Sequence, residues 1–414
     1  MDPRLRPHNT YLYAACVALA ACLAACGGST PTPTPSTTTA PPTASPTPSP
    51  VATLAGIEFT LPSGFFPTGL VAGPDNNLWV SEYAAADSGG AIAKVTTAGV
   101  ATNYAVPSSA AAGPITLGSD NALWFPFEGA NGAPSVNMGR ISTSGVVTAY
   151  PLPNTDTDIV SIASGSDGNL WYLADGVDNS GDSALRAFSP TSESIVANLA
   201  LPMATYGTPG SMVSNPSGGS LVIATSGSPG GLLKVTPSLT PTASFAYQAP
   251  VSDTGTFSSL AVGGGIIWGL YTSPSGGTSA QQLLNVNEST YAVSYISLPN
   301  ETWDPGSPGC SPGYCPLVFA GPIALGPDGN LYFWSTDTTA DPKGVAVGVV
   351  AVSQSGELLA FYNAQSLAGA SNEGLVVGPD GKIWSANSDG RDSSCCLIAI
   401  EPAGKSPATR PKRR

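Results

Sequence analysis

The chain has 414 residues, of which only 10 % are charged, while 48 are glycine and 40 are proline. Such a composition predicts many short strands separated by tight turns, since ordinary soluble domains contain roughly 25 % charged residues. Residues 51–401 carry 7 basic side chains against 26 acidic ones, which excludes a nucleic-acid groove because phosphate binding requires a basic surface.

The first segment has the features of an export signal. Arg4 and Arg6 precede an apolar run at 11–25 that is too short to span a bilayer, and small residues follow, so 1–25 is predicted to be a secretory signal peptide. Leu-Ala-Ala-Cys at 23–26 resembles the lipobox of bacterial lipoproteins. The resemblance implies that the Cys26 thiol receives diacylglycerol; a similar pattern ends at Cys22 but leaves a shorter apolar run. A secreted protein without lipid is the alternative.

The next segment is a spacer. Residues 29–50 are almost entirely Pro, Thr and Ser, a composition that favours extended polyproline II and buries nothing. We therefore predict a linker at 26–50 that holds a domain away from a membrane. The expected location is the bacterial cell envelope, on the periplasmic or cell-surface side, with membrane contact through the lipid anchor only.

One sequence pattern recurs seven times along 51–402. It consists of an apolar strand, a turn similar to Gly-Pro-Asp-Gly-Asn, and a Leu-Trp pair that opens a second strand. Equivalent positions fall at 79, 124, 171, 222, 268, 332 and 384. This spacing is typical of four-stranded propeller blades, and Asp-Gly between two apolar runs predicts a hairpin. The sequence therefore predicts an all-β, seven-bladed β-propeller over 51–402, followed by a basic C-terminal tail at 403–414.

The two ends of the repeat region are complementary. The seventh blade supplies its third strand at 397–400 and then runs into the charged tail, with no fourth strand. Residues 56–62 match the pattern of a fourth strand. We therefore predict that this N-terminal strand completes the last blade and closes the ring, which protects an edge that could otherwise pair with another chain.

Two further sets of residues recur at blade spacing, and we interpret both as structural. The first set consists of tryptophans that should pack between blades rather than form a ligand cage: Trp79, Trp124, Trp171, Trp268 and Trp384. The second set consists of one basic residue on the third strand of each of four blades, expected to bond a neighbouring blade's turn: Lys94, Arg140, Arg186 and Lys234.

The repeats resemble those of the virginiamycin B lyase family, the enzymes that linearise streptogramins. The likeness rests on Met-Gly-Arg-Ile at 138–141, Pro-Leu-Pro at 151–153 and Trp-Val-Ser-Glu at 79–82, and it covers most of 54–402. The resemblance implies a Mg²⁺-dependent carbon–oxygen lyase with a histidine as general base and carboxylates that position the metal. The only histidine of this chain is His8, in the predicted signal, so the predicted propeller lacks that base.

Carboxylates are the candidate ligand or metal residues. In a propeller, the loops between the second and third strands and the loops between blades share one face, here called the upper face, which is the usual ligand face. Oxygen ligands there suit Mg²⁺ or Ca²⁺, although no cofactor is assigned with certainty, and solvated loop acids are the alternative. The main candidates are Glu82, Glu128, Asp175, Asp178 and Asp182. Asp304, Asp337, Asp341, Asp389 and Asp392 are expected on the same face.

Four cysteines remain beyond the signal and the lipid site, namely Cys310, Cys315, Cys395 and Cys396. An even number of cysteines in an exported protein predicts disulfides, and four cysteines allow three pairings. A zinc site of four thiolates is the alternative, but the spacing differs from the usual paired CxxC.

Three functional hypotheses follow. The first is an exported, lipid-anchored, monomeric scaffold that binds a protein, glycan or small-molecule ligand on its upper face and is not an enzyme. The second is a metal-dependent lyase or lactonase-like hydrolase that uses the upper-face carboxylates. The third is a purely structural envelope protein. The sequence names no substrate, because propellers host many functions.

Overall fold

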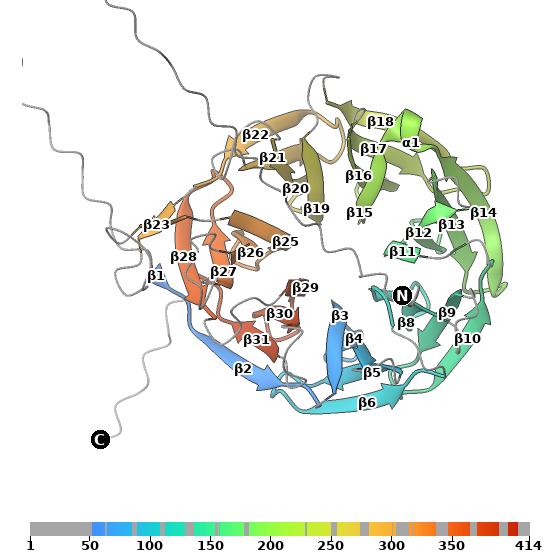
Figure 1. Cartoon of the computed structure of the whole chain (residues 1–414), viewed down its shortest axis with the longest axis horizontal. Coiled ribbons are helices and arrows are strands. Elements are labelled where there is room, and N and C mark those ends of the chain that lie inside the picture. Colours follow the sequence, from blue (N-terminus) through green and yellow to red (C-terminus); the bar gives the residue numbers. More distant parts are fainter. Residues whose placement is uncertain are drawn as a thin grey trace, which may run out of the picture. The chain divides into compact units, whose positions relative to one another are not determined.

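The computed structural model describes residues 52–404, apart from gaps at 63, 85–88, 108–111, 129–135, 154–155, 157, 178–181, 228–229, 250–254, 274–280, 300, 304–313, 317, 337–346, 365–370 and 389–395. Seven sheets stand as blades around a common axis, each with four blade strands, and the sheet of blade six carries a fifth strand at its outer edge (Figure 1). In each blade the first strand, A, lies innermost and the fourth, D, outermost. The predicted seven-bladed propeller is confirmed.

The blades follow one another along the chain, with strands A to D in order. Blade one contains β3 (Phe65–Ala72), β4 (Leu78–Ala84), β5 (Gly90–Val95) and β6 (Ala101–Ala105). Blade two contains β7 (Thr116–Leu117), β8 (Leu123–Glu128), β9 (Val136–Ile141) and β10 (Val147–Pro151). Blade three contains β11 (Asp158–Ser164), β12 (Leu170–Val177), β13 (Asp182–Ser189) and β14 (Ser194–Leu201).

The later blades repeat this arrangement. Blade four contains β15 (Thr208–Asn215), β16 (Ser220–Ser226), β17 (Gly231–Thr236) and β18 (Thr242–Gln248). Blade five contains β19 (Thr256–Gly263), β20 (Ile266–Thr272), β21 (Gln281–Asn287) and β22 (Val293–Ser297). Blade six contains β25 (Val318–Leu325), β26 (Leu331–Thr336), β27 (Val347–Val352) and β28 (Leu358–Asn363). Blade seven contains β29 (Ser371–Val377), β30 (Ile383–Ser388), β31 (Cys396–Ile400) and β2 (Gly56–Thr60).

The N-terminal strand closes the ring as predicted. β2 is strand D of blade seven and pairs antiparallel with β31, from Gly56 opposite Ile400 to Thr60 opposite Cys396. A shorter strand, β1 (Ala52–Thr53), precedes it and runs parallel to β28 at the outer edge of blade six. The sequence did not predict β1, because two residues are too few to form a recognisable pattern.

Two small elements lie between blades. The insertion before blade six contains the hairpin of β23 (Glu301–Trp303) and β24 (Tyr314–Pro316), in which Thr302 lies opposite Cys315. The helix α1 (Met203–Tyr206) connects blades three and four. No helix in the described part of the chain is both long and apolar enough to span a bilayer.

The core lies between neighbouring blades, and the repeating tryptophans are part of it. The five predicted tryptophans are fully buried, which confirms their packing role. In four blades the indole N–H donates to the aspartate four residues earlier, in the turn between strands A and B. These pairs are Trp79–Asp75, Trp124–Asp120, Trp171–Asp167 and Trp384–Asp380, at 2.9–3.1 Å.

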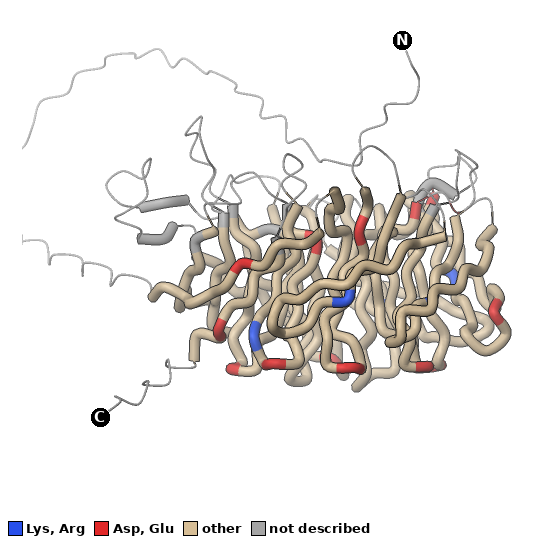
Figure 2. Tube along the Cα trace, turned by 90° about the horizontal axis from the view of Figure 1, so that it is seen from below, with Lys and Arg blue, Asp and Glu red and all other residues tan. Residues whose placement is uncertain are grey.

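The A–B turn explains why the repeat begins with glycine. The indole ring of Trp79 folds back over Gly73, and a Cβ atom at Gly73 would overlap that ring. The A–B and C–D turns form the lower face of the propeller. Figure 2 shows acidic residues recurring along one edge of the molecule, and the described contacts give the turn aspartates a structural role there.

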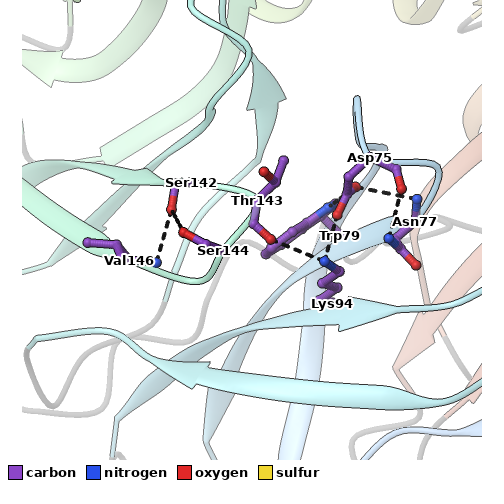
Figure 3. Close-up of polar contacts among 8 residues, drawn as sticks. All are labelled: Asp75, Asn77, Trp79, Lys94, Ser142, Thr143, Ser144 and Val146. Carbon is purple, nitrogen blue, oxygen red and sulfur yellow. Dashed lines mark hydrogen bonds and ion pairs between the residues drawn. The ribbon is translucent and has the colours of Figure 1, made fainter.

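The basic residues behave as predicted in two blades. Lys94 Nζ forms an ion pair with Asp75 Oδ2 at 2.8 Å and donates to the carbonyl oxygen of Thr143, in the C–D turn of blade two, at 3.1 Å (Figure 3). Lys234 lies 4.7 Å from the ring centre of Tyr291, in the C–D turn of blade five. These two residues therefore link their own blade to the next one.

The other two are structural as predicted, but the partners described for them do not lie in the turn of the next blade. Arg140 Nε pairs with Asp120 at 2.8 Å, within its own blade. Arg186 lies opposite Tyr172 rather than opposite the repeating Trp171, so it points to the other side of the sheet, because side chains alternate along a strand. There Arg186 forms an ion pair at 2.9 Å with the fully buried Asp156, which also accepts a hydrogen bond from the Tyr172 hydroxyl at 2.7 Å.

Candidate functional site

The four candidate carboxylates within the described residues lie on three different blades. Glu82 is fully buried in β4. Glu128 is the last residue of β8, and Asp175 lies in β12 opposite Asp158, but the side chains of Glu128 and Asp175 are outside the described part. Asp182 begins β13, and its Oδ1 accepts a hydrogen bond at 3.0 Å from the Met203 backbone N–H at the start of α1. Asp182 therefore has a structural partner, and of the two candidate side chains that the structure describes, Glu82 is the fully buried one.

The remaining predicted sites fall largely outside the described residues. Asp178, Cys26, Cys310 and Cys395 lie there, as do the five further loop aspartates, 304, 337, 341, 389 and 392. Cys315 and Cys396 belong to β24 and β31, but their side chains are not described, so the disulfide pairing stays a prediction. Within the described part of the chain, no three His, Cys, Asp or Glu side chains come close enough to hold a metal ion.

β-bulges recur on the innermost strands. Six of the seven A strands shift register at an equivalent level, where the pairing with strand B skips one or two residues. The skipped residues are Thr68, Val160, Gly210–Ser211, Ser259–Leu260, Gly321–Pro322 and Glu373. Bulges are frequent next to active sites, because they re-aim side chains. The A strands, which face the central axis, therefore interrupt their regular pairing with strand B at the same level in six blades.

Hydroxyl groups connect these bulges from one blade to the next. Ser161 Oγ accepts a hydrogen bond from the Met212 N–H at 3.2 Å, and Ser211 Oγ accepts one from the Leu260 N–H at 3.1 Å. In blade one, the Thr68 hydroxyl donates to the Ala112 carbonyl oxygen of blade two. These contacts hold neighbouring A strands at a fixed height.

Near the upper ends of the B strands, the buried residue is polar in some blades and apolar or aromatic in others. Three residues beyond the repeating aromatic position, blades one, six and seven have Glu82, Ser335 and Asn387, all at most 2 % exposed. Blades two, three and five have Phe127, Ala174 and Tyr271 at the same position. Thr225 of blade four is polar, but its hydroxyl bonds the Gly231 carbonyl oxygen in its own hairpin at 3.4 Å.

We refer to the buried polar residues of blades six, seven and one, together with two partly buried asparagines, Asn103 and Asn372, as the polar sector. Its members are Ser81, Glu82, Asn103, Trp334, Ser335, Asn372, Ser385, Asn387 and Ser388. Glu82 lies on one side of blade seven, where the two ends of the propeller meet, and Asn372, Ser385 and Asn387 lie on its other side. Ser81 and Ser335 lie on the far sides of blades one and six, which face blades two and five. It consists of hydroxyls, carboxamides, one indole and one carboxyl group.

Glu82 lies between blades one and seven. It shares a side of β4 with Leu78 and Val80, which pack against Trp384 and Leu397 of blade seven. Glu82 Oε2 accepts a hydrogen bond from Asn103 Nδ2 at 2.8 Å, while Oε1 is buried and has no hydrogen-bond partner. Burial raises the pKa of Glu82 to about 8, because the bond from Asn103 only partly offsets desolvation of the charged form. At neutral pH this carboxyl group is therefore mostly protonated.

A second polar cluster lies on the opposite side of blade seven, facing blade six. Asn372 Nδ2 donates to Ser385 Oγ at 2.6 Å and to Asn387 Oδ1 at 3.0 Å. Ser385 Oγ in turn donates to Asn387 Oδ1 at 3.2 Å. Asn372 Oδ1 and the Nε1 of Trp334 are both buried without a hydrogen-bond partner.

Most of the polar sector was not predicted from the sequence. Glu82 is a candidate in the sequence because it is charged, whereas Asn387 and Ser335 are uncharged and do not stand out singly. A signal was nevertheless present. Aligning the seven repeats on positions 79, 124, 171, 222, 268, 332 and 384 places Asn and Ser where other blades have Phe, Ala or Tyr.

Comparisons with known proteins agree with this architecture. Residues 53–184 match the virginiamycin B lyase family. A streptogramin B lyase structure superposes with a TM-score of 0.57 at 18 % identity, covering 84 % of this chain and 97 % of that chain. The catalytically inactive histidine-to-alanine variant of virginiamycin B lyase from Staphylococcus aureus with quinupristin gives a TM-score of 0.55 at 17 % identity, covering 84 % and 99 %.

Other similar folds carry different chemistry. Oligogalacturonate lyase in complex with manganese gives a TM-score of 0.57 at 10 % identity, covering 85 % of this chain and 98 % of that chain. No curated protein sequence matches the chain. Identities this low are evidence for fold alone, and the family match covers only residues 53–184, so the comparisons lead to one conclusion: the chain folds as a seven-bladed β-propeller, of which residues 53–184 are similar to the virginiamycin B lyase family.

Proposed function

We propose that this protein is an exported, lipid-anchored propeller that binds a ligand in its polar sector and does not turn it over through a histidine base. One observation carries the binding proposal. Four buried atoms without hydrogen-bond partners lie in this sector: Glu82 Oε1, Asn103 Oδ1, Trp334 Nε1 and Asn372 Oδ1. Each such group costs about 1–3 kcal/mol when it stays unpaired, so their concentration supports a site whose partner is a ligand.

The proposed lack of turnover rests on the residues available. The only histidine is His8, which precedes the propeller. The S. aureus virginiamycin B lyase variant that lacks one histidine is described as catalytically inactive, and its structure is with quinupristin. The structure of the inactive variant with quinupristin supports the idea that a virginiamycin B lyase-like propeller can bind a ligand without that histidine.

Quinupristin is therefore a direct probe of this proposal. We expect the purified protein to bind quinupristin in isothermal titration calorimetry, while chromatography shows no linear product after prolonged incubation with Mg²⁺. Asn387→Val should weaken the binding at least tenfold. The matched control is Thr225→Val, which removes a polar group at the equivalent position of blade four and should leave the affinity within twofold.

Two results would contradict the proposal. Accumulation of linearised quinupristin would identify the protein as a lyase and restore the metal-dependent enzyme as the leading hypothesis. Equal losses of affinity in Asn387→Val and Thr225→Val would place the binding surface away from the polar sector.

Export and lipid anchoring rest on the N-terminal sequence, with its positive flank, short apolar run and Leu-Ala-Ala-Cys motif. Stable anchoring requires at least two acyl chains. We expect the full chain, expressed in a bacterial host, to partition into the detergent phase of Triton X-114 and to label with radioactive palmitate. Cys26→Ala should move it to the aqueous phase and abolish labelling, whereas Cys22→Ala should change neither. Retained labelling of Cys26→Ala would contradict this assignment.

A further inference from the structure

We propose that the basic segment at 405–414 binds across the lower face of its own propeller, on the A–B turns of blades six and seven. Its cationic side chains pair there with Asp328 and Asp380, with which no basic side chain of the described part forms an ion pair. The segment contains no acidic residue, and its basic residues are Lys405, Arg410, Lys412, Arg413 and Arg414. The inference is independent of ligand binding in the polar sector.

In blades one and two, the turn aspartate has a basic partner within its own blade. Lys94 pairs with Asp75 at 2.8 Å, and Arg140 pairs with Asp120 at 2.8 Å. Both basic residues lie on strand C, directly opposite the repeating tryptophan of strand B. This position on strand C is therefore where a blade supplies the cation for its own turn aspartate.

Blades six and seven lack a cation at this position. The residue of strand C opposite the repeating aromatic residue is Ala351 in blade six and Ala399 in blade seven. Lys382 lies two residues after Asp380, but its Nζ forms an ion pair with Glu401 at 3.3 Å instead. Two neighbouring turns of the lower face therefore each carry an aspartate that has no counterion among the residues that the structure describes.

Asp328 carries a negative charge at neutral pH. Its Oδ2 atom accepts hydrogen bonds from the Asn330 side chain at 2.8 Å and from the Tyr332 hydroxyl at 2.9 Å, and both donors are neutral. Desolvation raises the pKa of Asp328, but the hydrogen bonds to its carboxylate outweigh desolvation, so the pKa lies below its ordinary value of 3.8. The side chain is only partly buried, so the charged carboxylate stays in contact with solvent.

The chain itself brings the basic segment to this turn. After β31 the chain passes from blade seven to blade six, where the Ala403 N–H donates to the Tyr332 hydroxyl at 2.7 Å and the Gly404 N–H donates to Asp328 Oδ2 at 3.2 Å. Gly404 is the last described residue, so Lys405 begins beside the Asp328 carboxylate. The basic segment therefore starts at an A–B turn of the lower face.

The length of the segment fits this surface. Residues 405–414 span at most about 33–36 Å when fully extended, and packed sheets lie about 10 Å apart, so the segment reaches the turn of blade seven from that of blade six. The exposed Glu357, in the C–D turn of blade six, adds a negative charge to the same face. Because the segment is tethered, its cations meet these carboxylates at roughly millimolar effective concentration, which favours it over a free cationic partner.

The first test is cross-linking of the full chain with a carbodiimide, which joins a lysine amine to a carboxylate in direct contact. Peptide mass spectrometry should find Lys412 joined to one of the two turn aspartates at low ionic strength. This product should decrease at least fivefold at about 1 M salt, where the Debye length is about 3 Å. The internal control is the cross-link between Lys382 and Glu401, which form an ion pair in the structure.

The second test measures tryptic cleavage after Lys412, which binding of the segment should slow. Asp328→Asn combined with Asp380→Asn should speed this cleavage at least threefold at low ionic strength. Asp167→Asn is the matched control and should leave the rate unchanged. Asp167 occupies the equivalent turn of blade three, bonds its own tryptophan and forms no ion pair within the described part. Circular dichroism checks that each variant is folded, and the cross-linking test needs no substitution.

Three results would overturn this inference. If the control cross-link forms while Lys412 reacts with neither turn aspartate, the segment does not bind the lower face. Equal acceleration of cleavage by Asp167→Asn and by the double variant shows attraction to the acidic body as a whole. Sedimentation of the protein with vesicles of phosphatidylcholine and phosphatidylglycerol in equal parts, without a Lys412 cross-link in their absence, assigns the segment to an anionic membrane instead. Quinupristin takes part in none of these experiments, so they do not depend on the proposed binding function.

Discussion

A chain that begins at Ser63 is expected to lose its cooperative unfolding transition. This truncation removes β2, the outer strand of blade seven, and leaves β31 with an unpaired edge. It also removes Phe59, which stacks on Trp384 at 5.3 Å between ring centres, and the buried Leu61. Full burial of one such side chain contributes about 1.5–3 kcal/mol, so the two together contribute at most about 6 kcal/mol, which is the lower end of the total stability of an ordinary domain.

The contact of blade one with β2 adds to this effect. Gly99, in the C–D turn of blade one, lies against the Phe59 ring so closely that a Cβ atom would overlap it. Loss of β2 therefore disturbs both sides of the ring junction. Without it, the ring is held at that point by the contacts of strands A to C of blades seven and one.

Two shorter truncations serve as controls in thermal unfolding followed by circular dichroism. A chain that begins at Ala52 should unfold like the full chain. A chain that begins at Gly56 loses only the two-residue β1 and should have a Tm lower by a few degrees. If the chain that begins at Ser63 has the same Tm as the chain that begins at Gly56, β2 does not contribute to the stability of the closed ring.

The free energy of unfolding of the wild-type protein is expected to fall as the pH rises from about 4.5 to about 8, and Glu82→Gln is expected to abolish this fall. The pKa of Glu82 rises from an ordinary value of 4.5 to about 8 on folding, so in this range the folded state binds a proton that the unfolded state has released. The free energy of unfolding therefore falls as pH rises through this window and levels off above it. The substituted glutamine would be neutral at every pH and would keep an oxygen that accepts from Asn103.

The measurement is urea unfolding at pH 5 and at pH 8.5. The wild-type protein should lose a few kcal/mol more than Glu82→Gln between these two values, since one pKa unit corresponds to about 1.4 kcal/mol. Glu357→Gln is the control, because Glu357 lies in the C–D turn of blade six, away from the polar sector, and should leave the slope unchanged. Parallel pH curves for the wild type and Glu82→Gln would show that Glu82 is solvated or paired.

The blade pattern was readable from the sequence because its contacts are local. The glycine, aspartate and tryptophan of the A–B turn interact within a few residues, as in Gly73, Asp75 and Trp79. A hairpin of this kind has much the same structure wherever it occurs, so its repetition revealed the number of blades. The complementary ends revealed the closing strand, because blade seven lacked one strand and residues 56–62 supplied it.

Arg186 shows where local reasoning failed. At the level of sequence it resembles Lys94 and Arg140, but its register with β12 differs by one residue. A shift of one residue moves a strand side chain to the opposite side of the sheet. As a result, Arg186 pairs with the buried Asp156 instead of a turn aspartate. Such register is a property of strand pairing and cannot be inferred from spacing alone.

The sequence by itself therefore determined the seven blades, the closing strand and the structural role of the tryptophans, because each depends on short-range patterns or on counting strands. Only the tertiary structure decided where the buried polar groups gather. Trp334, Asn372 and Asn387 come from three strands of two blades, and their proximity follows from how the sheets pack. The polar sector exists because the ring brings blades six, seven and one together, and Glu82 acquires its unusual pKa only when blade seven covers it.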